Sequence, residues 1–183
     1  MSTGTTIGVI VVVLVVLAAI AVLAKFLMQR KRLRSKFGPE YDRALEHNGS
    51  RMAAERELAE REREHSKLEL RALDAATREN YARNWTAVQE RFVDEPNEAV
   101  SQADQLLTDL MAERGYPTEG YERSEKMLSV GHARTLDHFR EAHSIAERKD
   151  RGEATTEDLR NAMVHYRTVF EDLLGDDREG ARR

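Results

Sequence analysis

The chain lacks cysteine altogether and contains only three prolines among its 183 residues. Without a thiol there is no disulfide framework, no thiolate metal site and no cysteine nucleophile. Aromatic residues are also scarce, at 6%. Outside the N-terminal region, no stretch alternates polar and apolar residues as a half-buried strand would. The absence of strand-like alternation predicts an all-α protein.

Charge is missing from residues 1–24, which contain no Asp, Glu, Lys or Arg, and residues 7–24 are uninterruptedly apolar. A helix over residues 7–28 would be roughly 33 Å long, which matches a bilayer core of about 30 Å. We therefore predict a transmembrane anchor. A cleaved secretory signal fits less well because no basic side chain precedes the apolar run, and a buried helix of a soluble core is the third alternative.

Basic residues follow the apolar run, and no acidic residue occurs before Glu40. The cluster consists of Lys25, Arg30, Lys31, Arg32, Arg34 and Lys36. The positive-inside rule keeps such a flank in the cytoplasm, so we expect an inner-membrane protein with its N-terminus outside. These six residues are the candidate membrane-interface site, with anionic lipid headgroups as partners. The simpler alternative is a stop-transfer flank with no recognition role.

The rest of the chain is acidic. Residues 37–183 hold 23 of the 29 Lys and Arg residues but all 33 Asp and Glu residues. No basic face with interleaved aromatic residues occurs beyond the juxtamembrane cluster. Nucleic acid is therefore not an expected partner.

Breaks in helical periodicity divide the chain into four parts: an N-tail and anchor (1–28), a basic juxtamembrane segment with a charged spacer helix (29–73), a four-helix-type bundle (74–175) and a disordered tail (176–183). The Phe37-Gly38-Pro39 break separates the anchor from a short helix over residues 40–47. A helix over residues 51–69 has little apolar content and is expected to be solvated. We expect the aromatic rings of Phe37 and Tyr41 at the membrane interface, with packing against the bundle as the alternative.

Apolar residues recur with helical spacing throughout the predicted bundle. Tyr81, Trp85, Val88 and Phe92 form one stripe, for which Asp74 is the candidate N-cap. Pro96 begins a second helix with a broad apolar face. Further helices are expected over residues 121–131, over residues 132–149 and from Thr155 or Thr156 to Gly175. Helices with one apolar stripe each pack as a bundle.

No pattern of residues predicts catalysis, a metal ion or a cofactor. His132, His138 and His143 fall on different sides or distant turns of one helix, so they cannot share an ion unaided. His165 on the last helix makes a two-helix site imaginable, but the paired Glu-x-x-His signature of di-metal bundles is missing. Glycine-rich phosphate loops, G-x-S-x-G and H-E-x-x-H are absent as well. We interpret the histidines as ordinary surface or boundary residues.

The segments RSKFGPEYDRALE, RFVDEPNEAVSQAD, MAERGYP, LSVGHA and GEATTEDLRNAMVHYR resemble those of a family of small single-pass bacterial membrane proteins. The resemblance covers nearly the whole chain. It implies an N-terminal anchor, an FGPEYDR segment, a charged helix and a C-terminal helical domain at a bacterial cytoplasmic membrane. It implies no activity, cofactor or functional residue.

Three functions are consistent with this organisation. The first is a non-enzymatic, membrane-tethered interaction or scaffold module that binds an unidentified protein partner. The second is a homo-oligomeric structural membrane protein that associates through the span, the charged helix or an exposed stripe of the bundle. The third is a helical-bundle enzyme or metal protein.

Overall fold

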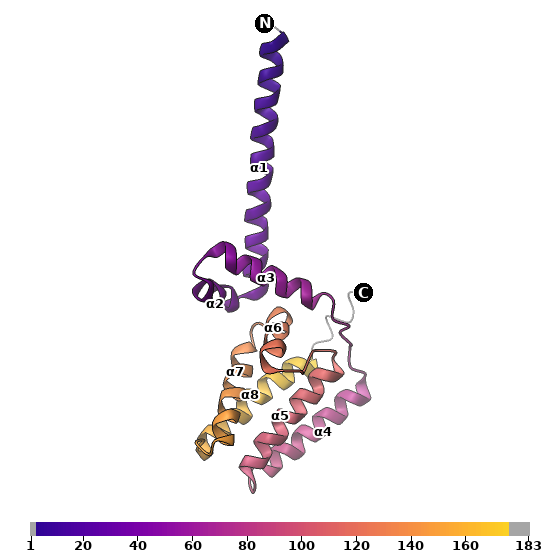
Figure 1. Ribbon diagram of the computed structural model, residues 1–183. Coiled ribbons are helices and arrows are strands. Elements are labelled where there is room, and N and C mark those ends of the chain that lie inside the picture. The colour runs from indigo at the N-terminus through magenta and orange to yellow at the C-terminus, as the bar shows by residue number, and fades with distance from the viewer. Residues whose placement is uncertain (1–2, 176–183) are drawn as a thin grey trace. The chain divides into compact units, whose positions relative to one another are not determined.

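The computed structural model describes residues 3–175, and every regular element within that range is an α-helix (Figure 1). The predicted all-α fold class is confirmed. The predicted tail over residues 176–183 lies outside the described residues. The chain divides into two compact units, Met1–Leu58 and Ala59–Arg183, which are described separately. The helices are α1 (Thr3–Phe37), α2 (Pro39–Asn48), α3 (Arg51–His65), α4 (Ala75–Arg91), α5 (Pro96–Glu113), α6 (Tyr121–Gly131), α7 (Leu136–Asp150) and α8 (Thr156–Gly175).

Helix α1 is a continuous 35-residue helix, and its large apolar side chains from Val11 to Met28 are not buried by protein. Val11 is 53% exposed at one end of the described apolar stretch, and Met28 is 66% exposed at the other. The helix is long enough and apolar enough to cross a membrane. Residues 29–37 then extend the same helix beyond its apolar part and carry most of the basic cluster.

The chain reverses sharply after α1, and this reversal creates the core of the first unit. Gly38 adopts a left-handed φ of 50°, and Pro39 occupies the first turn of α2, where its missing N–H costs nothing. Phe37 and Tyr41, on either side of the break, are 0% and 1% exposed. The expectation that these two rings lie at the membrane interface is wrong, because the reversal places both of them inside the protein.

Helix α3 differs from the solvated spacer that its charge content predicts. It ends at His65, and Ala54 and Leu58, one turn apart, are both fully buried. Two hydrogen bonds tie its first half to α2: Tyr41 Oη donates to Glu55 Oε1 at 2.7 Å, and Asn48 Nδ2 donates to Glu57 Oε2 at 2.6 Å. A narrow apolar stripe is therefore enough to bury one face of α3 despite its high charge content. The buried apolar side chains of the first unit come from three helices: Leu33, Phe37, Tyr41, Ala44, Ala54 and Leu58.

Two phenylalanines on α1 provide a matched test of this small core. We expect Phe37→Ala to remove roughly 3 to 5 kcal/mol of packing and to raise amide hydrogen exchange throughout α2. Phe26→Ala is the control, because Phe26 is 60% exposed whereas Phe37 is fully buried. Hydrogen–deuterium exchange of the full chain in detergent micelles measures both variants. Equal exchange in α2 for the two variants would contradict the assignment of Phe37 to a core.

The second unit begins with α4, which Asp74 caps as predicted. An Asp74 carboxylate oxygen accepts a hydrogen bond from the Thr77 backbone N–H at 2.8 Å. Trp85, from the predicted stripe, is 6% exposed and stacks on Phe170 of α8 with ring centroids 5.0 Å apart. The stripe thus joins α4 to α8, and the interpretation of Trp85 as a core residue is confirmed.

Helices α5 and α8 form the centre of this unit. Helix α5 packs against α4, α7 and α8, and α8 packs against α4, α5 and α7, while the shorter α6 packs against α7. Every apolar residue of the predicted broad face of α5 is buried: Ala99, Val100, Ala103, Leu106, Leu107, Leu110 and Met111. Helix α7 begins at Leu136 rather than at His132, because residues 132–135 form a turn.

The ends of α8 are fixed by specific side chains. Thr155 and Asp158 form a reciprocal cap in which Thr155 Oγ1 accepts from the Asp158 N–H and an Asp158 oxygen accepts from the Thr155 N–H. At the other end, the buried Arg114 donates through Nη1 to the carbonyl oxygen of Leu173 at 2.8 Å. That bond satisfies a carbonyl group that the last turn of a helix leaves without a partner.

Gly115 allows a close approach between two backbone segments. It has a φ of 86°, and a Cβ at this position would collide with the carbonyl oxygen of Glu69. Next to it, the Arg71 N–H donates to the carbonyl oxygen of Arg114 at 3.0 Å. Only glycine therefore lets the segment before α4 pack against the end of α5.

We expect Gly115→Ala to be clearly more destabilising than Gly152→Ala. Both glycines have a left-handed φ, so alanine costs about 1 kcal/mol of backbone strain at each. Only Gly115 adds a collision with backbone, worth roughly a further 1 to 3 kcal/mol, whereas nothing lies within 4 Å of a Cβ at Gly152. Urea denaturation of the full chain, followed by circular dichroism, measures the difference. Equal losses would show that the approach of Glu69 relaxes at no cost.

Candidate functional site

The six basic residues predicted at the membrane interface all lie on α1, in the first unit. Five of their side chains are exposed and that of Arg30 is half-buried. At about 100° per residue they are distributed around the helix, so they form a collar and not a one-sided patch. Arg34 lies 3.8 Å from Asp42 in an exposed ion pair. We define this set (Lys25, Arg30, Lys31, Arg32, Arg34 and Lys36) as the basic collar.

Arg30 also reaches the small core beneath the collar. Burial and the neighbouring Glu55 carboxylate raise the pKa of Tyr41, and the Arg30 guanidinium partly offsets this effect. Tyr41 therefore stays a neutral phenol that donates its proton to Glu55. The collar and the FGPEYDR segment are parts of one folded junction.

The histidines are separated into distinct environments. His138 Nδ1 lies 2.8 Å from His165 Nδ1, so one ring donates the proton of this bond and the other accepts it. Burial and the neighbouring His138 lower the pKa of His165. His143 instead stacks on Tyr121 with ring centroids 3.8 Å apart. Within residues 3–175, no group of three or more His, Asp or Glu side chains is placed to hold a metal ion.

His132 is the centre of a buried hydrogen-bonded chain and not a surface residue as expected. Its Nδ1 lies 2.7 Å from Asp172 Oδ2, and its Nε2 lies 3.1 Å from the Tyr116 hydroxyl. Thr135 Oγ1 donates to the same Asp172 oxygen at 2.7 Å. His132 and Tyr116 are each only 3% exposed. This Asp-His-Tyr chain joins the turn before α7 to the end of α8, with its His and Tyr members buried and Asp172 partly exposed.

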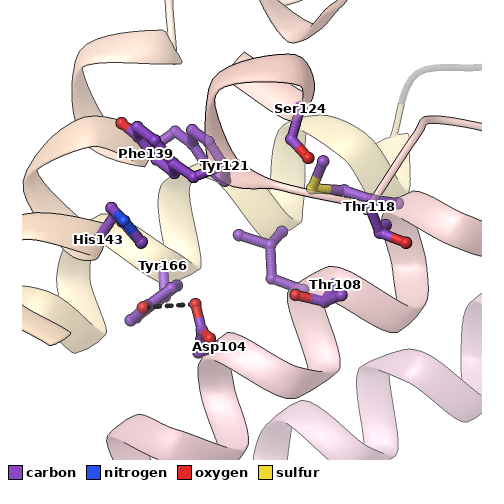
Figure 2. A pocket seen from close by; sticks show the side chains of 10 residues that line it. Asp104, Thr108, Thr118, Tyr121, Ser124, Phe139, His143 and Tyr166 are labelled. Carbon is purple, nitrogen blue, oxygen red and sulfur yellow. Dashed lines mark hydrogen bonds between the residues drawn. The ribbon is translucent and has the colours of Figure 1, made fainter. Parts of the chain in front are cut away.

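A cavity of about 150 Å³ lies elsewhere in the second unit (Figure 2). Four helices and the loop before α6 build its wall, and the view shows polar and aromatic side chains facing one another across it. At about 150 Å³ the cavity is smaller than typical ligand pockets of roughly 300 to 1,000 Å³, so it has room only for a very small molecule. The residues that line it are Asp104, Leu107, Thr108, Met111, Thr118, Tyr121, Ser124, Phe139, His143 and Tyr166.

Aromatic rings form one side of the cavity. Tyr121 stacks nearly parallel to both Phe139 and His143, at interplanar angles of 8° and 9°. Phe139 and His143 are one turn apart on α7, so the helix itself sets their spacing. Burial, together with the carboxylates of Glu125 and Glu147, raises the pKa of Tyr121, which is therefore uncharged.

A carboxylate and a phenol form the opposite side. Tyr166 Oη donates to Asp104 Oδ1 at 2.8 Å, which Figure 2 draws as a dashed line. Burial raises the pKa of Tyr166 strongly, and Asp104 and Asp150 add to the effect. Asp104 is the one carboxylate in the lining, and no Lys or Arg is among the lining residues. The field inside the cavity is therefore negative.

Sequence reasoning did not identify this cavity. Tyr121 and Tyr166 lie in predicted amphipathic helices without any feature that marks them, and Asp104 is one of 33 acidic residues. The available signal was a polar pair, Asp104 and Thr108, one turn apart beside the buried stripe of α5. This polar pair indicates a cavity only once the positions of α6, α7 and α8 around it are known.

Comparison with known proteins adds nothing to this geometry, since no protein-family model, no curated protein and no solved structure matches the chain.

The partly exposed Asp172 predicts how the stability of the fold depends on pH. Hydrogen bonds from His132 and Thr135 hold the pKa of Asp172 below its ordinary value of 3.8. The ionised form is thus favoured by folding, so its contribution is complete above about pH 4 and is lost as the pH falls through the lowered pKa. We expect Asp172→Asn to cost about 1 to 2 kcal/mol at pH 7, since Asp172 is 39% exposed and solvent weakens its bonds.

Urea denaturation at several pH values tests this prediction. The difference between wild type and Asp172→Asn should shrink steadily below about pH 4. Glu171→Gln is the matched control, because Glu171 is the exposed neighbour and pairs only with Arg167 one turn away. Its effect should stay below about 0.5 kcal/mol. A loss of stability in Asp172→Asn that does not change with pH would contradict the stabilising role of the Asp172 charge.

Proposed function

We propose that the chain is a single-pass membrane protein whose helical second unit serves as an interaction module at the membrane. The observation that carries the proposal is α1, whose apolar side chains are exposed on all sides over the length of a bilayer core. An exposed apolar surface of this size is unfavourable on a monomeric protein in water, whereas it is favourable in contact with lipid. A lone span in lipid must also be helical, because every backbone polar group needs a partner within it.

Orientation follows from the basic collar. Positive residues close to one end of a span keep that end in the cytoplasm, so the N-terminus would lie outside and both folded parts inside. The collar would contact anionic headgroups at about 1 kcal/mol per basic residue near the surface. The resemblance to single-pass bacterial membrane proteins supports the cytoplasmic membrane as the location.

Tethering and partner binding account for the second unit better than catalysis does. The His132 and Tyr116 rings of its Asp-His-Tyr chain are buried, and among the residues that line its cavity no pair is hydrogen-bonded as nucleophile and base. The surplus of acidic residues disfavours nucleic acid and favours a protein partner with a neutral or basic surface. A homo-oligomer that associates through the same surfaces is the alternative.

Two arginines in the span test the anchor. We expect the double substitution Leu14→Arg and Leu17→Arg to shift the protein from the membrane pellet to the soluble fraction, because each central arginine costs about 2.5 to 3.5 kcal/mol of insertion. Met52→Arg with Val164→Arg is the control, since both side chains are similarly exposed but lie outside α1. Carbonate extraction measures the partition. A wild-type chain extracted by carbonate would refute the anchor.

Reporter fusions and cross-linking test the remaining steps. A C-terminal alkaline phosphatase fusion should be inactive and a C-terminal fluorescent protein fusion bright, as for a cytoplasmic C-terminus. The opposite pattern would refute the orientation. Cross-linking in cells should yield a discrete product with a different protein. Products that contain only multiples of the chain's own mass would support the homo-oligomeric alternative instead.

A further inference from the structure

The cavity of the second unit offers a set of hydrogen-bond acceptors. Asp104 Oδ1 accepts a hydrogen bond from Tyr166, and among the described residues its Oδ2 accepts none. A carboxylate has about four acceptor positions, so most of the capacity of Asp104 faces the cavity unused. The hydroxyl groups of Thr108 and Thr118 also line the cavity, and neither is bonded to another described side chain.

The sign of the electrostatic field in the cavity decides whether an anionic, a neutral or a cationic ligand is favoured. No Lys or Arg is among the lining residues, so Asp104 is the source of the negative field in the cavity. The nearby Glu125 and Asp150 carboxylates are paired with Arg140 and Lys149 and add little to it. An anion is therefore repelled. An uncharged apolar ligand would remove water from Asp104 without replacing the hydrogen bonds.

The aromatic side adds a second reason for a cation. Tyr121, Phe139 and Tyr166 contribute π-systems to the wall, and such rings attract an ammonium group. The cavity volume of about 150 Å³ limits the ligand to about the size of benzene, which an engineered cavity of about that volume binds in another protein.

We propose that this cavity is a binding site for a small primary ammonium ion, held by Asp104 Oδ2 and the hydroxyl group of Thr108, one turn away on α5. An ammonium group has three N–H donors, so it can bond to this charged and this neutral acceptor and keep one donor for water. Its short alkyl chain lies against Tyr121, Phe139 and Met111. The site belongs to the second unit alone, so it does not depend on the membrane anchor or on a protein partner.

Methionine signals make the site observable in the intact protein. The full chain, in micelles of an uncharged detergent and labelled with ¹³C at its six methionine methyl groups, is titrated with n-butylammonium. We expect a saturable shift of the Met111 signal, because Met111 lines the cavity, and no shift of the Met163 signal, because Met163 lies in a separate groove beside α4. 1-Butanol should bind at least about tenfold more weakly and butyrate not at all, because each lacks the charge that Asp104 attracts.

Two aspartates on α5 provide the matched variants. Asp104→Asn should weaken n-butylammonium binding at least about tenfold, whereas Asp109→Asn should leave it unchanged, because Asp109 is exposed and bonds only to Gln105. Thr108→Val, which keeps the side-chain shape, should weaken binding by a smaller factor and serves if Asp104→Asn does not fold. The comparison of the three probes requires no variant.

The proposal is overturned by any of three results: no saturable shift of Met111 with n-butylammonium, equal binding of 1-butanol, or unchanged affinity in a folded Asp104→Asn variant. Shifts of all methionine signals together would indicate an effect on the micelle and would also overturn it. A loss of membrane partition in the span variants has no bearing on these outcomes, so the two proposals fail independently.

Discussion

An apolar helical surface that no part of the protein covers is the constraint on which the rest of the molecule depends. From Val11 to Met28 the side chains of α1 are exposed, and they are aliphatic or aromatic rather than charged, apart from Lys25 near the end. Burying such a surface in a soluble core would need partners that the remaining helices do not supply, since each of them carries one stripe that is already buried in its own unit. The excess of apolar surface in one segment therefore separates the chain into an apolar helix suited to lipid and a folded remainder suited to water.

The junction between rod and remainder is itself folded. A helix that left the bilayer and continued into a loop would leave Leu33 and Phe37 in water, but Gly38 reverses the chain and α2 and α3 supply the missing cover. Two polar contacts of this junction, Tyr41 with Glu55 and Asn48 with Glu57, join α2 to α3, and the Arg34–Asp42 ion pair joins α1 to α2. The same few residues thus end the span, cover its last turns and hold the two following helices together. These combined roles explain why the FGPEYDR segment contains both a helix break and two large aromatic residues.

Periodicity predicted most of the helices, because an amphipathic stripe and a cap are local signals. Asp74, Pro96 and the Thr155 turn begin helices where the sequence suggests, and the apolar face of α5 is buried residue by residue. The features that local signals did not predict depend on contacts between residues far apart in the sequence. His132 leaves the predicted helix because Asp172, 40 residues away, binds its ring. The burial of Phe37 depends on a reversal whose direction no hydrophobic pattern encodes. The cavity arises where four helices fail to fill the space between them, so its lining could not be read from any one of them.

The single tryptophan lies in the second unit, where its ring stacks on Phe170 and its indole N–H is buried without a hydrogen-bond partner among the described residues. The first unit contains no tryptophan. Intrinsic fluorescence excited at the red edge of protein absorption therefore reports the packing of α4 on α8 and does not report on the first unit. Emission that moves to longer wavelength would mark water reaching this one ring, while the loosening of α2 from α1 would pass without an optical signal.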